Sequence, residues 1–156
     1  MGYRSEVAYR IVVRDKVILN EVIAKVMMLG GTVCQALREC EIEVGVIDQD
    51  GVETPAECYI NFFTSDAKWY PDYQDVMGHH ALMDKIVEWY PDDSAWYFLR
   101  IGEESDDVEE NHDGDSDLVD YVWDGMHVVR SLELPFSHCY KPVGDNLRIL
   151  DSSSKV

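Results

Sequence analysis

The side chains of this 156-residue chain that could do chemistry are five histidines, four cysteines and a large excess of carboxylates. His79 and His80 are adjacent, and neighbouring residues on a helix point about 100° apart, so this pair cannot easily chelate one ion. The remaining histidines and the cysteines do not form the spaced ligand sets that zinc requires, and no C-x-x-C occurs. We therefore expect no metal centre, no cofactor and no catalytic residue that a local motif would mark.

The cysteines are expected to be reduced thiols that pack as small apolar side chains, because the N-terminus lacks the apolar segment of a secretory signal. They are Cys34, Cys40, Cys58 and Cys139.

One segment partly matches a calcium-binding loop. Asp113, Asp115 and Asp117 form its D-x-D-x-D opening, and Asp124 falls at position twelve. Position six should be a glycine that allows a sharp turn, but it is Leu118, and no helical pattern flanks the segment. The sequence leaves open whether a divalent cation binds here.

The charge balance excludes several classes of function. The chain has 31 acidic and 13 basic residues, a formal net charge of −18 and a pI near 4.4. Direct binding to nucleic acid needs clustered Lys and Arg, which are absent, and the same reasoning disfavours anionic membrane surfaces. No apolar run approaches the 18 residues that would predict a transmembrane helix.

Half of this net charge is concentrated in residues 103–117, which carry nine acids and no base. Self-repulsion and low hydrophobicity predict a solvated, mobile loop. A carboxylate-rich surface can bind a basic groove, so we treat these acids as candidate protein-binding residues. They are Glu103, Glu104, Asp106, Asp107, Glu109, Glu110, Asp113, Asp115 and Asp117.

Aromatic residues provide a second candidate surface. Trp69, Tyr70 and Trp89 lie in or beside a predicted helix, close to acidic residues, in a combination typical of protein-binding hot spots. Packing within the core or against the sheet is the simpler interpretation of any one of them.

A few bases stand at the ends of predicted elements, and we expect carboxylates to pair with them. The alternative is a polar pocket that they form with Glu103, Asp106 and Asp107. These bases are Arg4, Lys68, Arg100 and Arg130.

The hydrophobic periodicity predicts a single α+β domain over residues 1–150, followed by a disordered tail at 151–156. Alternating or β-rich patterns predict strands over 6–13, 41–47, 57–64, 95–101, 118–123 and 127–134. Helical spacing predicts helices from Asn20, as N-cap, to Leu29, over 32–40 and over 71–90. This order is that of a two-layer sandwich of ferredoxin-like βαββαβ type with one or two added C-terminal strands.

Four segments carry a resemblance: GYRSEVA at 2–8, KWY at 68–70, RIGEESDD at 100–107 and VVRSLEL at 128–134. Together they resemble a group of small acidic proteins encoded by tailed bacteriophages. The resemblance implies a phage origin and a bacterial host cytoplasm. It assigns no functional residue, because no activity is established for the group.

These observations lead to one functional hypothesis and two alternatives. The hypothesis is a non-enzymatic phage accessory protein that binds and inhibits a host or bacterial defence protein, with acidic-surface competition against nucleic acid as one route. The first alternative is a small-ligand-binding domain or an enzyme with a cryptic site. The second is a virion or oligomeric structural protein. The sequence does not predict the oligomeric state.

Overall fold

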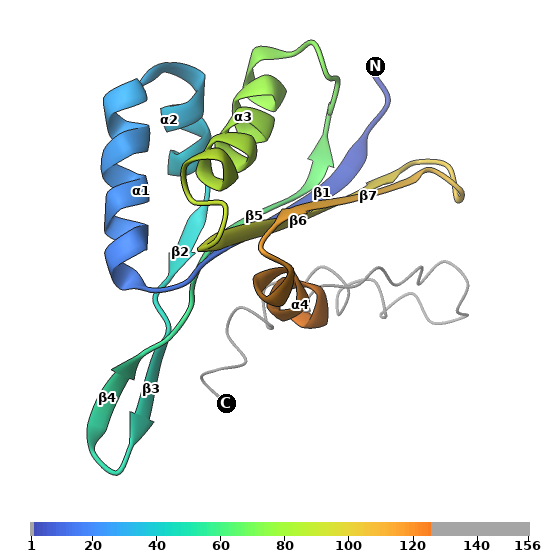
Figure 1. Cartoon of the computed structure of the whole chain (residues 1–156). Helices are drawn as coiled ribbons and strands as arrows, with labels where there is room; N and C mark the ends of the chain where they lie inside the picture. The colour runs from blue at the N-terminus through green and yellow to red at the C-terminus, as the bar shows by residue number, and fades with distance from the viewer. Residues whose placement is uncertain (1, 126–156) are drawn as a thin grey trace.

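A computed structural model describes residues 2–125 of the chain, as one antiparallel sheet with helices on both faces and a separate two-stranded hairpin (Figure 1). The sheet has the strand order β2-β5-β1-β6-β7, and the hairpin consists of β3 and β4. The strands are β1 (Ser5–Val13), β2 (Glu41–Glu43), β3 (Val46–Gln49), β4 (Val52–Pro55), β5 (Cys58–Ala67), β6 (Ser94–Gly102) and β7 (Val108–Gly114). The helices are α1 (Lys16–Leu29), α2 (Gly31–Arg38), α3 (Gln74–Trp89) and α4 (Ser116–Gly125).

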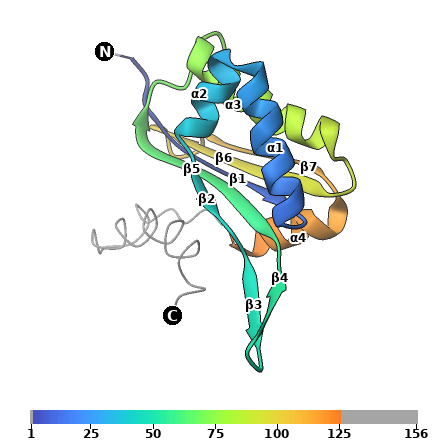
Figure 2. The same ribbon diagram turned by 90° about the vertical axis from the view of Figure 1, so that its left-hand side faces the viewer.

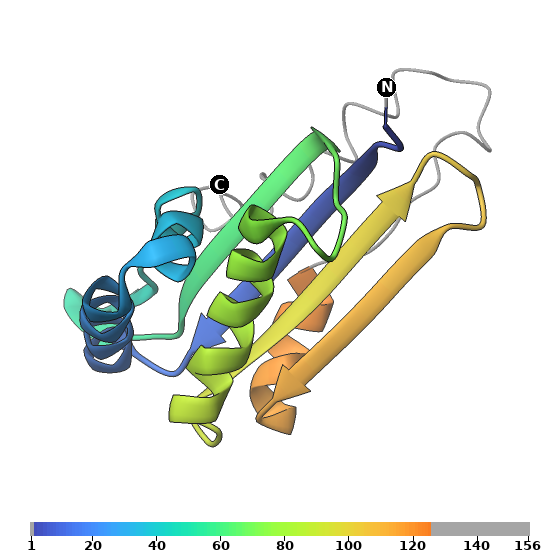
Figure 3. The same ribbon diagram turned by 90° about the horizontal axis from the view of Figure 1, so that it is seen from above.

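The α+β prediction is confirmed, and the connections follow the predicted βαββαβ pattern. Helices α1 and α2 connect β1 to β2, and α3 connects β5 to β6. The order β2-β5-β1-β6 is that of a ferredoxin-like sheet, to which β7 adds one strand. Helices α1, α2 and α3 cover one face of the sheet, and α4 lies on the other (Figures 1 and 3).

The central strand β1 divides its side chains between two cores. Val7, Tyr9 and Ile11 point to the helix-covered face and join the larger core, while Ala8 and Val12 join the smaller core under α4. This follows from the period of two in a strand, which sends successive side chains to opposite faces. β1 is therefore buried on both faces and paired on both edges, with β5 and β6.

The first helix starts earlier than predicted. Asp15, not Asn20, is the N-cap of α1, and its carboxylate accepts a hydrogen bond from the amide of Ile18 at 3.0 Å. Such a cap satisfies an amide that has no partner within the helix. The short helix predicted after the glycine pair is confirmed as α2, and Gly30 and Gly31 form the corner with φ values of 64° and 61°.

The predicted strand over 41–47 is divided in two. Only β2 pairs with β5, while β3 turns into β4 and forms a hairpin that projects beyond the sheet (Figure 2). Asp50 and Gly51 form its turn with φ values of 54° and 79°. Asp-Gly is typical of a hairpin turn, and here it connects β3 to β4 and not the strands of the main sheet.

The prediction of a mobile acidic loop over 103–117 is wrong for most of that segment. Residues Val108–Gly114 form β7, which pairs with β6 along its length. The predicted strand at 118–123 is also wrong, because this stretch belongs to helix α4. Leu118 and Val122 are fully buried against the sheet, whereas Asp120 between them is exposed. A strand would place all three side chains on one face, but a helix turns Asp120 away from the other two. The predicted strand at 127–134 and the tail at 151–156 lie outside the described residues.

Within residues 2–125, no helix combines the length and the apolar character needed to cross a bilayer.

We predict that Leu118→Ala lowers the free energy of unfolding by about 2–5 kcal/mol, because it opens a cavity where α4 packs on the sheet. Chemical denaturation followed by circular dichroism measures this change. Asp120→Ala, at an exposed position of the same helix, is the control and should change stability by less than about 0.5 kcal/mol. Equal effects of the two variants would contradict the packing of α4.

Candidate functional site

A chain of three hydrogen-bonded side chains runs from the core to the surface. The Tyr9 hydroxyl lies 2.6 Å from Nδ1 of His79, and Nε2 of His79 lies 3.1 Å from Oε1 of Glu39. These residues come from β1, from α3 and from the C-cap of α2. Tyr9 and His79 are buried, whereas Glu39 is exposed, so the chain connects the sheet to solvent.

The direction of these bonds follows from the carboxylate. A carboxylate can only accept hydrogen bonds, so Nε2 of His79 carries the proton and donates to Glu39. Nδ1 of His79 then accepts a hydrogen bond from the Tyr9 hydroxyl. Burial lowers the pKa of His79, although Glu39 opposes this, and the ring is neutral at pH 7. Burial also raises the pKa of Tyr9 well above its ordinary value, and that of Cys40, 3.4 Å from the same hydroxyl, to about 12. With pKa values this high, Tyr9 and Cys40 stay protonated and do not act as nucleophiles. Their hydrogen bonds hold the helices on the sheet.

Next to this chain, Trp69 lies at the centre of an aromatic cluster. Its ring centroid is 5.5 Å from that of His79, 5.8 Å from His80, 5.9 Å from Phe62 and 6.2 Å from Phe98. Within residues 2–125 the buried indole N–H of Trp69 has no hydrogen-bond partner. A buried donor without a partner costs about 1–3 kcal/mol, so this N–H is a candidate for contact with a ligand.

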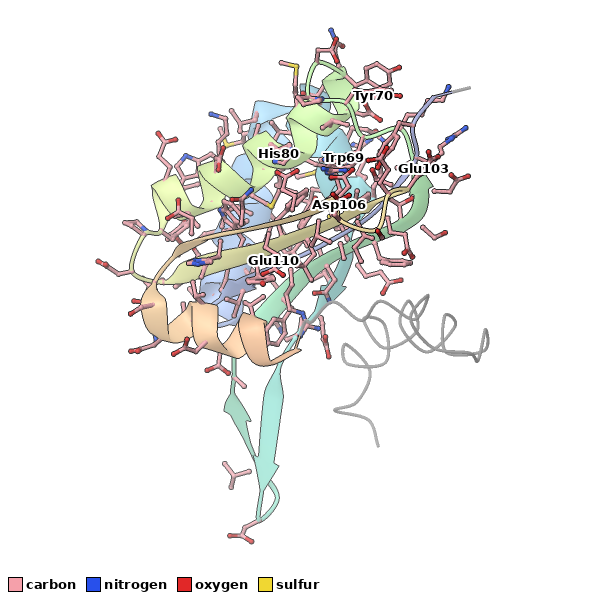
Figure 4. All side chains as sticks on the ribbon, turned by 90° about the vertical axis from the view of Figure 1, so that its right-hand side faces the viewer. Trp69, Tyr70, His80, Glu103, Asp106 and Glu110 are labelled. Atoms are coloured by element: carbon pink, nitrogen blue, oxygen red, sulfur yellow. The ribbon has the colours of Figure 1, made fainter. Side chains whose placement is uncertain are left out.

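His80 is the second polar group of this region. Its ring packs 5.1 Å from that of Phe98, and burial lowers its pKa, an effect that Glu109 partly opposes. The structure shows no hydrogen bond to its imidazole from the rest of residues 2–125. Figure 4 shows Trp69 and His80 close together above the sheet.

A network of charges lies beside these rings, at the end of the sheet where β1 begins. Arg100 donates to both carboxylate oxygens of Asp107, at 2.7 and 3.1 Å, and to Glu109 at 3.0 Å. It also donates to the hydroxyl of Ser5 at 3.2 Å. The Tyr3 hydroxyl donates to Asp107 at 2.7 Å.

We define the Trp69–His80 site as Trp69 and His80 together with Arg100, Asp107 and Glu109. It combines an N–H donor, an imidazole that is neutral at pH 7 and two carboxylates that an arginine holds in place. A neutral imidazole with a pKa below its ordinary value can take up and return a proton at neutral pH. The arrangement is suited to binding a small polar molecule and to acid–base chemistry.

The nine acids of the predicted protein-binding run do not form one surface. Glu103, Glu104 and Asp106 are exposed at the turn between β6 and β7, where Figure 4 labels Glu103 and Asp106. Asp107 and Glu109 bind Arg100. The other four are distributed along β7 and α4. Of these, Glu110 accepts from Tyr97 on the opposite face, Asp113 accepts from Gly114, Asp115 caps α4 and Asp117 lies in its first turn.

The three aromatic residues predicted to form a binding surface lie in different parts of the structure. Tyr70 accepts a hydrogen bond from the amide of Tyr3 at 2.7 Å and contacts Tyr73. Trp89, at the far end of α3, lies under the Lys25 ammonium at 5.5 Å. Only Trp69 belongs to the site described above.

Pairing of the bases is confirmed for two of them. Arg4 lies 3.6 Å from Asp66, and Arg100 binds Asp107. Of the three acids named for the alternative polar pocket, Asp107 pairs with Arg100, whereas Glu103 and Asp106 do not bind this arginine. Lys68 lies against Gly2, and Arg130 lies outside the described residues.

The partial calcium motif has a structural explanation. Asp115 accepts hydrogen bonds from the amides of Asp117 and Leu118 and so caps α4. Residues 2–125 contain no group of three or more His, Cys, Asp or Glu side chains arranged to hold a metal ion.

Sequence reasoning identified no role for Tyr9, Glu39, His79 or His80. One signal was available for His79, because Val76, His79 and Met83 recur at helical spacing and all three are buried on α3. A histidine on the apolar face of a helix needs a polar partner, and β1 supplies Tyr9. Glu39 and His80 gave no such signal.

Comparison with known proteins identifies little. No family model matches the chain, and no curated protein matches it. One solved structure, a phage SAM lyase in complex with S-methyl-5′-thioadenosine, resembles it with a TM-score of 0.36 and 13% sequence identity. The match covers 71% of this chain and 91% of the other.

The hypothesis of a non-enzymatic inhibitor of a host or defence protein is not retained, and the protein in the matched structure is an enzyme. The hypothesis had relied on the acidic run as an unpaired binding surface, and β7 and α4 engage several of its carboxylates. At this degree of likeness, the function of the present chain has to be argued from its own residues.

We predict that stability falls as the pH drops below about 6.5, the ordinary pKa of histidine. The pKa of folded His79 is lowered, so the unfolded chain binds more protons in this range and protonation favours unfolding. Melting temperatures between about pH 7.5 and 5 measure the slope, which should be shallower in His79→Gln. His112→Gln, an exposed control, should keep the wild-type slope, and identical slopes in all three proteins would contradict the buried neutral ring.

Proposed function

We propose that this protein is an enzyme that binds a small polar molecule at the Trp69–His80 site and transfers a proton with His80. In this proposal the Trp69 indole N–H donates a hydrogen bond to an acceptor on the ligand. The neutral His80 imidazole takes a proton from the ligand or, once protonated, returns one.

The observation that carries the proposal is the buried N–H of Trp69, which has no partner within residues 2–125, beside the His80 ring. A ligand acceptor would offset the cost of this donor. The indole N–H of Trp96 is also buried and has no hydrogen-bond partner within the described residues. Trp69 differs in that its ring contacts both His79 and His80, and Glu109 of the Arg100 network acts electrostatically on His80.

Two groups of hydrogen-bonded side chains hold the residues of this site in place. The Tyr9–His79–Glu39 chain fastens α3 to the sheet immediately before His80 and so limits where that ring can lie. Arg100 holds the carboxylates of Asp107 and Glu109, and Glu109 favours the protonated form of His80. Glu109 would therefore partly offset the cost that burial imposes on a proton received by His80.

We also propose that the protein acts in the cytoplasm of a bacterial host and derives from a bacteriophage. The resemblance of four segments to small acidic phage proteins supports this origin. Cys34, Cys40 and Cys58 are free thiols in the structure, as suits a reducing compartment.

S-methyl-5′-thioadenosine and SAM are suitable first probes, because each offers a planar ring and several acceptors to an aromatic site with an N–H donor. We expect calorimetry to detect binding and chromatography to detect conversion of SAM. His80→Gln should reduce turnover by about 10²-fold or more while leaving the fold intact, because it removes the proton acceptor. Trp69→Phe should weaken binding, because it removes only the N–H donor and keeps the aromatic packing.

His112→Gln is the matched control, since His112 lies on the opposite face of the sheet and stacks on Tyr97. It should bind and react as the wild type does. Equal losses in His80→Gln and His112→Gln, or probes that leave the NMR signals of the His80 ring unchanged while they bind, would contradict the proposed site.

A further inference from the structure

The residues that precede β1 lie next to the Trp69–His80 site and bond to two separate parts of it. The amide of Tyr3 donates to the Tyr70 hydroxyl at 2.7 Å, and the Tyr3 hydroxyl donates to Asp107, also at 2.7 Å. Tyr70 directly follows Trp69 in the chain, and Asp107 binds Arg100. Tyr3 therefore connects the Trp69 side of the site to its charged side.

On the Trp69 side, the contacts hold a stretch of chain that belongs to no strand or helix. Residues 68–70 lie in the connection between β5 and α3 and have no ladder of strand hydrogen bonds. A Cβ on Gly2 would lie 2.7 Å from the Tyr70 hydroxyl and 3.2 Å from Cε of Lys68. The backbone at residues 2 and 3 thus passes close to both neighbours of Trp69 and restrains the segment that carries it.

On the charged side, the Tyr3 hydroxyl uses both of its hydrogen-bonding functions. It accepts from the Glu104 amide at 3.0 Å while it donates to Asp107. Gly102 permits this approach, because a Cβ there would clash with the Tyr3 hydroxyl and with the Asp107 carboxylate. Since Arg100 binds both oxygens of that carboxylate, the additional bond from Tyr3 restricts it to one orientation.

We propose that Tyr3 is a positioning residue of the Trp69–His80 site, which holds the Trp69 segment and the β6–β7 turn at a fixed separation. This role rests on the proposed function, in which the ligand binds between these two parts. Tyr3 acts through Tyr70 on one side and through Asp107 and Arg100 on the other. Such restraint matters because a displacement of about 1 Å within a site can lower a rate by about 10²-fold.

Two Tyr→Phe variants test the proposal, because each removes one hydroxyl and keeps its ring. Tyr3→Phe removes the bonds to Asp107 and Glu104, and Tyr70→Phe removes the acceptor of the Tyr3 amide. In both variants, hydrogen exchange of the buried Trp69 indole N–H, followed by NMR without a ligand, should become about fivefold faster, because loss of a hydrogen bond favours local opening. The affinity for S-methyl-5′-thioadenosine, measured by calorimetry, should fall by a similar factor.

Tyr90→Phe is the matched control. The Tyr90 hydroxyl also donates to a carboxylate at 2.7 Å, that of Glu21, but it lies at the C-cap of α3, at the other end of this helix from Tyr70. This variant should keep the wild-type exchange rate and affinity.

An exchange rate of the Trp69 N–H that stays at the wild-type value in Tyr3→Phe and Tyr70→Phe would overturn the proposal. Equal acceleration in all three variants would overturn it as well, because a general loss of stability would then explain the effect. Faster exchange in Tyr3→Phe and Tyr70→Phe alone, in a protein that binds neither S-methyl-5′-thioadenosine nor SAM, would support the positioning of Trp69 by Tyr3 and count against the proposed function.

Discussion

The central strand β1 imposes the constraint on which the rest of the structure depends. It is buried on both faces, yet it carries a tyrosine and an arginine, and buried polar groups must be paired. Tyr9 finds His79 on the helix-covered face. Arg10 finds Asn61 at 2.8 Å and the Tyr59 ring at 4.3 Å on the other face. Tyr9 therefore fixes the position of α3 on the sheet, whereas Arg10 links β1 to the neighbouring strand β5.

The pairing of Tyr9 has consequences for the candidate site. His79 can reach Tyr9 only if α3 lies across β1, and this position brings His80 over Phe98 and next to Trp69. The same burial that keeps His79 neutral lowers the pKa of His80, which stands one residue further along the helix. The position of α3 thus determines both the Tyr9–His79 hydrogen bond and the location of His80, the group suited to proton transfer.

The distribution of charge explains where sequence reasoning failed. Nine acids in 15 residues were interpreted as a repelling, solvated loop, because the sequence shows the charges and not their partners. In the structure, Arg100 lies on the neighbouring strand β6 and binds Asp107 and Glu109, while Tyr97 binds Glu110. Pairing across a sheet thus allows an acidic segment to form a strand. Likewise, Asp115 of the partial calcium motif accepts hydrogen bonds from the first amides of α4 and so caps that helix.

Local patterns in the sequence were sufficient to predict β1, β5, β6, α2, the approximate extent of α3 and the α+β class, because periodicity and capping act between residues close in the chain. Only the tertiary structure decided that Tyr9, Glu39 and His79 form one chain of hydrogen bonds and that Trp69 lies against His80. The members of these contacting pairs are 11 to 70 positions apart in the sequence. Hydrogen bonding and desolvation depend on distances in space that no local pattern encodes.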